Sequence, residues 1–252
     1  MKVFFATPAY DGRVDAFFTA ALIQSMDLLR QVPIESVWFP SCGCCYLPTV
    51  RNHLVDEFLT TDCTDLVFLD ADLYWEPAGI LKILKPDLDV VGGVYPKKAD
   101  TEQYPVWIKT QGEPPTPRGR LVDGEPMIEC WGLPTGFLRI RRRVFDVMRE
   151  RELAPEVVEH DDQGRETRRF HAYFDTGFLE PDNPTKWWGE DLWFCWKWVK
   201  CGGQCWAVPD IDFHHVGMKA WAGNYDGYLR RLPGGSHDGN GTKDADAWRE
   251  VL

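Results

Sequence analysis

Apolar and polar positions follow two alternating patterns along the chain before residue 98. Short apolar runs, typical of strands buried in a sheet, are residues 2–6, 34–39, 66–69 and 90–93. The segments between them have apolar positions three or four apart, which predicts helices over residues 14–31, 50–59 and 76–84. This alternation predicts an α/β fold of βαβ units, with a central, mostly parallel sheet flanked by helices.

The pattern changes after residue 98. Residues 111–126 are rich in Pro and Gly and predict a loop, while the highly charged residues 154–172 predict an exposed excursion. Further strands are predicted over residues 127–131, 137–140 and 204–208, and further helices up to about residue 151 and over residues 190–200. The tail from about residue 217 has no clear periodicity, so we expect it to fold over a site or to fray.

The size and charge of the chain limit the classes of protein to which it can belong. The chain has 252 residues, 44% of them hydrophobic, which is ample for one large domain. Its formal net charge of -11 disfavours generic binding of nucleic acid or anionic membranes. Arg139, Arg141, Arg142 and Arg143 form a basic cluster, which we interpret as a solvated stretch beside a strand end. Contact with nucleic acid is the alternative interpretation of this cluster.

The N-terminal residues enter a strand directly, without the apolar segment and small-residue cleavage site of an export signal. No run of about 18 apolar residues predicts a membrane span. We therefore expect a soluble, cytoplasmic chain (in the host cytoplasm if the source is a virus), whose eight cysteines are thiols. Cys42, Cys44 and Cys45 lack a second Cys or His pair at zinc-finger spacing, so we favour thiols over a zinc site.

The clearest sign of a functional site in the sequence is an apolar strand that is followed by two carboxylates. Asp70 and Asp72 directly follow the strand predicted over residues 66–69. Ligands of open α/β sheets bind beyond the carboxyl ends of the strands, and residues i and i+2 of an extended segment face the same side. The two carboxylates could hold a divalent cation, which could hold a phosphate-bearing ligand. A solvated turn, where Asp is common, is the alternative.

Three further features add candidate chemistry, each with a plain structural alternative. Tyr10 follows the first strand and could stack on a base, or be a half-buried loop aromatic. Arg51 offers a planar fork for phosphate or carboxylate, or is an ordinary exposed helical arginine. Glu190 and Asp191 open a helix, where carboxylates favour the N-terminus, but one of them could instead take a proton from an acceptor hydroxyl.

A pair of histidines lies late in the chain. His214 and His215 are adjacent, so in an extended segment their rings point to opposite faces. Only one of them can easily reach back as a third metal ligand. A histidine with an ordinary hydrogen bond is the alternative for either ring.

Taken in chain order, these residues resemble the motifs of GT-A fold glycosyltransferases, of the small type found in phages, large DNA viruses and bacteria. The segments that carry the resemblance are Thr7-Pro8-Ala9-Tyr10, Arg51-Asn52, Phe68-Leu69-Asp70-Ala71-Asp72, Val91-Gly92-Gly93-Val94-Tyr95-Pro96, Gly136-Phe137, Gly189-Glu190-Asp191 and His215-Val216-Gly217. The resemblance spans roughly residues 2–217, and the ordered set is more specific than the short DxD motif alone.

The resemblance implies a single GT-A catalytic domain, a Rossmann-like nucleotide-diphospho-sugar transferase, over residues 1–217. Its donor-binding half is about residues 1–98 and its acceptor half about residues 99–217. The tail over residues 218–252 is then expected to pack near the active site or to be partly flexible.

The resemblance also implies a role for each matched residue. Asp70, Asp72 and His215 match the ligands of Mn²⁺ or Mg²⁺, with His214 as the fallback. The implied donor-binding positions are Thr7, Pro8, Ala9, Tyr10, Arg51, Asp70, Ala71, Asp72 and Gly136. Tyr95-Pro96-Lys97-Lys98 lie where such enzymes shape the donor-sugar and acceptor side. Asp191 matches the catalytic base of inverting members, with Glu190 next in line.

The expected function is metal-dependent transfer of a sugar from a UDP- or GDP-linked donor to a hydroxyl of a glycan, a protein or a hydroxymethylated DNA base, with inversion. Tryptophans around the acidic pair modestly favour a sugar substrate, although they also fill cores. One alternative is a sugar-phosphate nucleotidyltransferase, against which the single Gly of residues 7–13 counts. A non-catalytic carbohydrate-binding module of the same fold is the other alternative.

Overall fold

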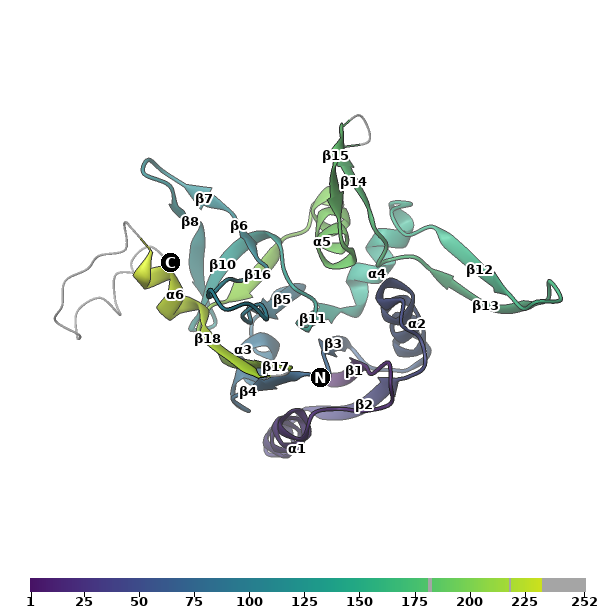
Figure 1. The fold of residues 1–252 in the computed structure, drawn as a ribbon, viewed down its shortest axis with the longest axis horizontal. Coiled ribbons are helices and arrows are strands. Elements are labelled where there is room, and N and C mark those ends of the chain that lie inside the picture. The colour runs from purple at the N-terminus through teal and green to yellow at the C-terminus, as the bar shows by residue number, and fades with distance from the viewer. Residues whose placement is uncertain (181–182, 218, 233–252) are drawn as a thin grey trace.

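A mixed sheet of nine strands forms the centre of the computed structural model, which describes residues 1–180, 183–217 and 219–232 (Figure 1). The strand order is β2-β1-β3-β11-β5-β16-β10-β6, and β9 pairs with β10. These strands are β1 (Lys2–Pro8), β2 (Glu35–Ser41), β3 (Asp65–Leu69), β5 (Val90–Gly93), β6 (Trp107–Ile108), β9 (Gly119–Val122), β10 (Glu125–Gly132), β11 (Phe137–Arg141) and β16 (Cys205–Val208). The predicted α/β class is confirmed.

The direction of the strands confirms one prediction only in part. β1 is parallel to β2 and to β3, and β16 is parallel to β5, but β11 runs antiparallel between β3 and β5. β10 is antiparallel to all three of its neighbours. The sheet is therefore mixed: β10 and β11 run against the other seven strands, so the expectation of a mostly parallel sheet is confirmed only in part. An apolar run shows that a strand is buried but carries no information about its direction.

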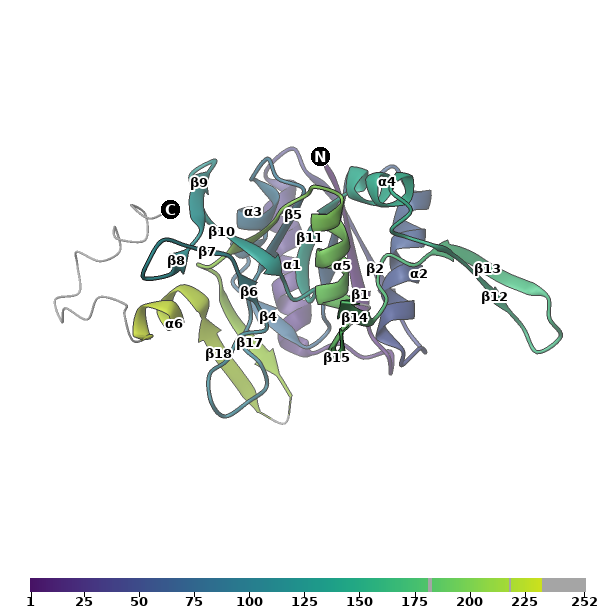
Figure 2. The same cartoon turned by 90° about the horizontal axis from the view of Figure 1, so that it is seen from above.

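Helices cover both faces of this sheet. They are α1 (Ala16–Arg30), α2 (Leu47–Thr60), α3 (Gly79–Leu84), α4 (Arg142–Glu150), α5 (Glu190–Lys200) and α6 (Tyr225–Arg231). One core cluster joins the sheet to α2, α4, α5 and α6, and the other joins it to α1 and α3 (Figure 2, with α5 in front). Neighbouring residues of β1 go to opposite clusters, Phe4 to the first and Phe5 to the second. Burial on both faces explains the continuous apolar runs.

A second, smaller sheet includes the first part of the predicted tail. Its order is β18 (Ala220–Asn224), β17 (Asp212–Val216) and β4 (Leu73–Trp75). α6 follows β18 and buries Tyr225 and Leu229 in the main core. Residues 219–232 therefore belong to the folded body, while residues 218 and 233–252 lie outside the described residues. The expected donor and acceptor halves also share one sheet, because β11 lies between β3 and β5.

Hairpins project from the body (Figure 1). β12 (Glu156–His160) and β13 (Glu166–His171) form the longest, which confirms the charged excursion expected over residues 154–172. β14 (Gly177–Glu180) and β15 (Asn183–Trp188) form another directly before α5. Residues 111–126 are not a plain loop, because they contain β9 and complete a hairpin of β7 (Thr110–Gln111) with β8 (Thr116–Pro117). No described helix is both long and apolar enough to cross a membrane.

Candidate active site

The candidate site forms where the ends of three strands meet. β11 runs antiparallel to β3, so the start of β11 lies beside the carboxyl end of β3. This arrangement places Gly136 next to Asp70, whose N–H donates to the Gly136 carbonyl over 2.9 Å. Tyr95 arrives from the end of β5, and the Gly136 N–H donates to its hydroxyl oxygen over 3.1 Å. Burial, followed by the charge of Asp70, raises the pKa of Tyr95, so this hydroxyl stays neutral.

The DxD segment forms a turn instead of the extended segment expected from sequence. The N–H of Leu73 donates to the carbonyl of Asp70 over 3.1 Å and closes the turn. Asp70, Ala71 and Asp72 still line one cleft of about 730 Å³. The two carboxylates take different partners, however, because a turn does not keep residues i and i+2 on one face. The alternative interpretation, a solvated turn, is correct about the turn but incomplete, since both carboxylates form ion pairs.

Asp72 has a cationic partner and an imidazole partner. Lys98 Nζ donates to Oδ2 over 2.5 Å, and His215 Nε2 lies 3.5 Å from Oδ1. Burial opposes ionisation of Asp72, but the contacts to His215 and Lys98 outweigh it and lower the pKa of the carboxyl. His215 Nδ1 lies 2.9 Å from the carbonyl oxygen of Pro96, which accepts only, so Nδ1 carries a proton.

The choice between the two histidines is made by the register of the small sheet. β17 pairs with β4, and His214 lies opposite Tyr74, with their rings 5.4 Å apart. His215 faces the other way, towards Asp72. The expected alternation therefore holds, and His215 is the histidine that lies beside Asp72.

The predicted set of three metal ligands is not assembled. Among residues 1–180, 183–217 and 219–232, no three His, Cys, Asp or Glu side chains come together as a group that could hold a metal ion. Asp70 pairs with Arg51 instead of joining Asp72 and His215. The remaining pair still offers a carboxylate oxygen of Asp72 and an imidazole nitrogen of His215, 3.5 Å apart. Such a pair fits a cation whose other ligands come from phosphate and water.

Arg51 joins the two acidic groups and does not line the cleft. It is 2% exposed, with Nη2 3.2 Å from Asp70 Oδ1 and Nε 3.4 Å from Glu190 Oε1. Burial opposes its charge, but Asp70 and then Glu190 outweigh that effect and raise the pKa of the guanidinium. Its Nη1 is buried without a hydrogen-bond partner. Arg51 is therefore neither the exposed helical arginine nor the donor-binding arginine at the cleft surface that the sequence suggested.

Asp191 has the chemical character of a base. Burial, followed by repulsion from Glu190, raises its pKa to about 6. The N–H of Leu192 donates to its Oδ1 over 2.7 Å, and the positive charge of Arg51 partly offsets the rise. A carboxylate with this pKa is ionised at neutral pH and binds a proton more strongly than an ordinary aspartate.

The loop after β1 lies only partly where the sequence predicts it. Pro8, Ala9 and Tyr10 line the cleft, and Tyr10 is 63% exposed. Thr7 is instead fully buried within β1, where its hydroxyl accepts a hydrogen bond from Trp38 Nε1 over 2.9 Å. The expectation that Thr7 lines the nucleoside was therefore wrong, because β1 extends further than the apolar run indicates.

Sequence reasoning missed two residues of the site, Arg13 and Asp15, and one contact, that between Lys98 and Asp72. Arg13 and Asp15 also line the cleft, and Asp15 caps α1 by accepting from the N–H of Phe17. The Asp15 cap could have been found from its position just before an apolar helical pattern. The contact between Lys98 and Asp72 has no signal in sequence, because it depends on where the segment after β5 turns.

Gly136 has no room for a side chain. A Cβ atom there would lie 2.4 Å from Asp70 Oδ2 and 2.5 Å from the Tyr95 hydroxyl. We expect Gly136→Ala to displace Asp70 and to cost about 1–3 kcal/mol of folding free energy, as overpacking does. Chemical denaturation measures this loss. The control is Gly227→Ala in α6, where the nearest atom is 3.5 Å away. Equal stability of the two variants would contradict the tight contact.

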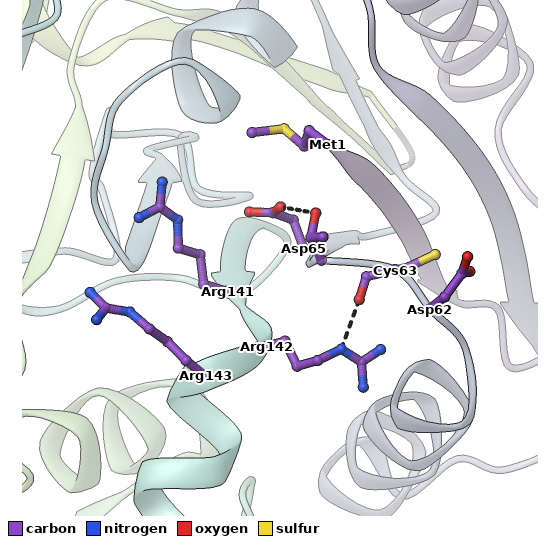
Figure 3. Close-up of a pocket in the computed structure, with 8 residues that line it drawn as sticks. Met1, Asp62, Cys63, Asp65, Arg141, Arg142 and Arg143 are labelled. Atoms are coloured by element: carbon purple, nitrogen blue, oxygen red, sulfur yellow. Dashed lines mark hydrogen bonds between the residues drawn. The ribbon is translucent and has the colours of Figure 1, made fainter.

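The basic cluster proves to be structural. It borders a cavity of about 440 Å³ at the opposite edge of the sheet (Figure 3). Arg142 donates to four carbonyls at and after the end of α2, among them that of Cys63. Arg139 is fully buried against Asp65, and the remaining two arginines pair with Asp87 and Asp89. The expected solvated stretch describes Arg143, whose side chain is 67% exposed, but not the buried Arg139, and three of the four arginines are paired with carboxylates.

Comparison with known proteins returns no family. No protein-family model matches the chain, and no curated protein matches it. The geometry of the site is therefore the basis for any statement about function.

Proposed function

We propose that the chain is a metal-dependent glycosyltransferase of the GT-A type, which moves a sugar from a nucleoside-diphosphate sugar to an acceptor hydroxyl. The observation that carries this proposal is that Arg51 links two acidic sites. It pairs with Asp70 of the turn over residues 70–72 and with Glu190, the neighbour of Asp191. Asp72 lines the cleft with His215 beside it, while Asp191, with a pKa of about 6, lies beside Glu190. Sugar transfer needs both functions, because the leaving diphosphate gains negative charge while the incoming hydroxyl loses a proton.

The proposal assigns a separate role to each group of residues. Tyr10 stacks on the base and the turn over residues 70–72 faces the diphosphate, which agrees with their positions along one cleft. Asp72 and His215 hold Mn²⁺ or Mg²⁺, which stabilises negative charge on the diphosphate when it is bound. Asp191 accepts the proton of the acceptor hydroxyl, which favours inversion at the anomeric carbon. Asp70 and Arg51 position these two groups relative to each other.

The internal pairing of the arginine cluster removes the main reason to favour a nucleic-acid acceptor. We therefore propose a glycan or protein hydroxyl as the acceptor ahead of a hydroxymethylated DNA base. Cytoplasmic location stays an expectation from the sequence.

Asp72→Asn tests the proposal, because it keeps the size of a half-exposed side chain and removes its charge. Wild-type protein is incubated with UDP- and GDP-sugars and Mn²⁺, and the released products are identified. We expect release of a nucleoside diphosphate that Asp72→Asn and excess chelator both abolish. Release of pyrophosphate would instead identify a nucleotidyltransferase. Absence of release together with metal-dependent nucleotide binding would favour a non-catalytic module.

A further inference from the structure

Lys98 is the cation nearest to the carboxylate of Asp72. Its ammonium lies 2.5 Å from Asp72 Oδ2, on the oxygen that His215 does not face. The side chain of Lys98 is 34% exposed and that of Asp72 is 44% exposed, so this ion pair borders solvent. A pair at such a position contributes little to stability and breaks readily.

Backbone hydrogen bonds on both sides of Lys98 hold the chain in place, whereas the long side chain can rotate. The Lys97 N–H donates to the Gln103 carbonyl over 2.7 Å, and the Ala99 N–H donates to the Lys97 carbonyl over 2.9 Å. The stem of Lys98 runs past Gly217, where a Cβ atom would lie 3.4 Å from Lys98 Cδ. Gly217 lines the same cleft as Asp72. Rotation of the four-carbon stem therefore moves the ammonium along the rim of the cleft while the backbone stays in place.

An ammonium and a divalent cation compete for one carboxylate. A cation held between Asp72 Oδ1 and His215 would share the carboxylate with the ammonium on Oδ2, and the repulsion between the two positive charges would weaken the contact of Lys98. The departing ammonium then lies beside the place where the proposed function puts the donor diphosphate. Phosphate oxygens accept hydrogen bonds from lysine strongly, since both groups carry charge.

We propose that Lys98 is a displaceable counterion of Asp72. It neutralises the carboxylate while no divalent cation is bound, and after displacement it binds the diphosphate of the donor. This inference rests on the proposed function and gives Lys98 a specific role in binding the donor diphosphate. It predicts effects of opposite sign on the metal alone and on the nucleotide, which neither a structural ion pair nor a simple donor contact produces.

The test compares Lys98→Met with Lys219→Met. Lys219 lies near the same segment and pairs with Asp100, so its removal changes the net charge equally without touching Asp72. Binding of Mn²⁺ alone is measured by the loss of the free-ion signal in electron paramagnetic resonance. We expect Lys98→Met to bind Mn²⁺ about fivefold more tightly than Lys219→Met does. Binding of UDP or GDP at saturating Mn²⁺ is then measured by calorimetry, and we expect about tenfold weaker binding by Lys98→Met.

Each outcome decides the inference. Equal Mn²⁺ affinity of the two variants, or no Mn²⁺ binding by any form, overturns the role of counterion. Equal nucleotide affinity of the two variants overturns the contact with the diphosphate. Failure of the proposed function looks different, because wild-type protein would then release no nucleoside diphosphate from sugar nucleotides while the shift in Mn²⁺ affinity persisted.

Discussion

Replacing Asp191 by Asn is expected to slow sugar transfer by about 10²–10⁴-fold, the usual contribution of a positioned general base. Asn keeps the shape of the side chain and can still accept the hydrogen bond from Leu192, but it cannot take a proton from a hydroxyl. Release of nucleoside diphosphate in the presence of an acceptor measures the rate. The matched control is Glu190→Gln, which removes the neighbouring charge and leaves Asp191 in place. A larger loss in the control would move the base to Glu190.

The same variant is expected to be more stable than wild type at pH 7–8. The pKa of Asp191 is raised from 3.8 to about 6 in the fold, so the folded protein binds this proton more tightly than the unfolded chain does. The associated stability is fully present below about pH 4 and is lost as the pH rises through about 6. Asn has no charge to desolvate, so the variant avoids a cost of about 1–3 kcal/mol at neutral pH. Urea denaturation at pH 5 and pH 8 measures the difference, which should be larger at pH 8.

The pH dependence of wild-type transfer follows from the same pKa. The rate is expected to rise about tenfold per pH unit below pH 6 and to level off above it, because Asp191 must be ionised to act as a base. A rate that stays constant between pH 5 and pH 8 would argue against Asp191 as the base.

Much of the site could be predicted because it follows directly from the strands that precede it. Asp70 and Asp72 had to lie at a sheet edge once residues 66–69 formed a strand, and the alternation of β17 had to separate His214 from His215. These inferences need only the local chain direction. The turn over residues 70–72 was missed because the short strand β4 pairs with β17, which is remote in sequence.

The remaining features depend on packing between distant segments. Arg51 resembles any surface arginine in sequence, and its burial arises only when α2 packs on the sheet beside the start of α5. Likewise, Gly136 reaches Asp70 because β11 inserts in the antiparallel direction. No local pattern carries either fact, which is why the link between the two carboxylate sites appears only in three dimensions.

Replacing Arg51 by Met is expected to cost about 3–5 kcal/mol of folding free energy, since it leaves Asp70 and Glu190 without their shared cation. The control is Arg139→Met, which breaks the even more deeply buried pair with Asp65 at the far edge of the sheet. Both variants should lose stability in urea denaturation. Only loss of Arg51 should alter the site, because its charge lowers the pKa of Asp191.

Arg51→Lys separates these effects if Arg51→Met does not fold. Lysine keeps the positive charge but lacks the planar fork that reaches two carboxylates at once. We expect a smaller loss of stability and an upward shift of the pH at which transfer is half-maximal, because Asp191 then has a weaker cation beside it. Adding Glu190→Gln to Arg51→Met should restore part of the stability, since one uncompensated charge is removed with its partner. An unchanged pH profile in Arg51→Lys, with stability lost as in Arg139→Met, would reduce Arg51 to a purely structural ion pair.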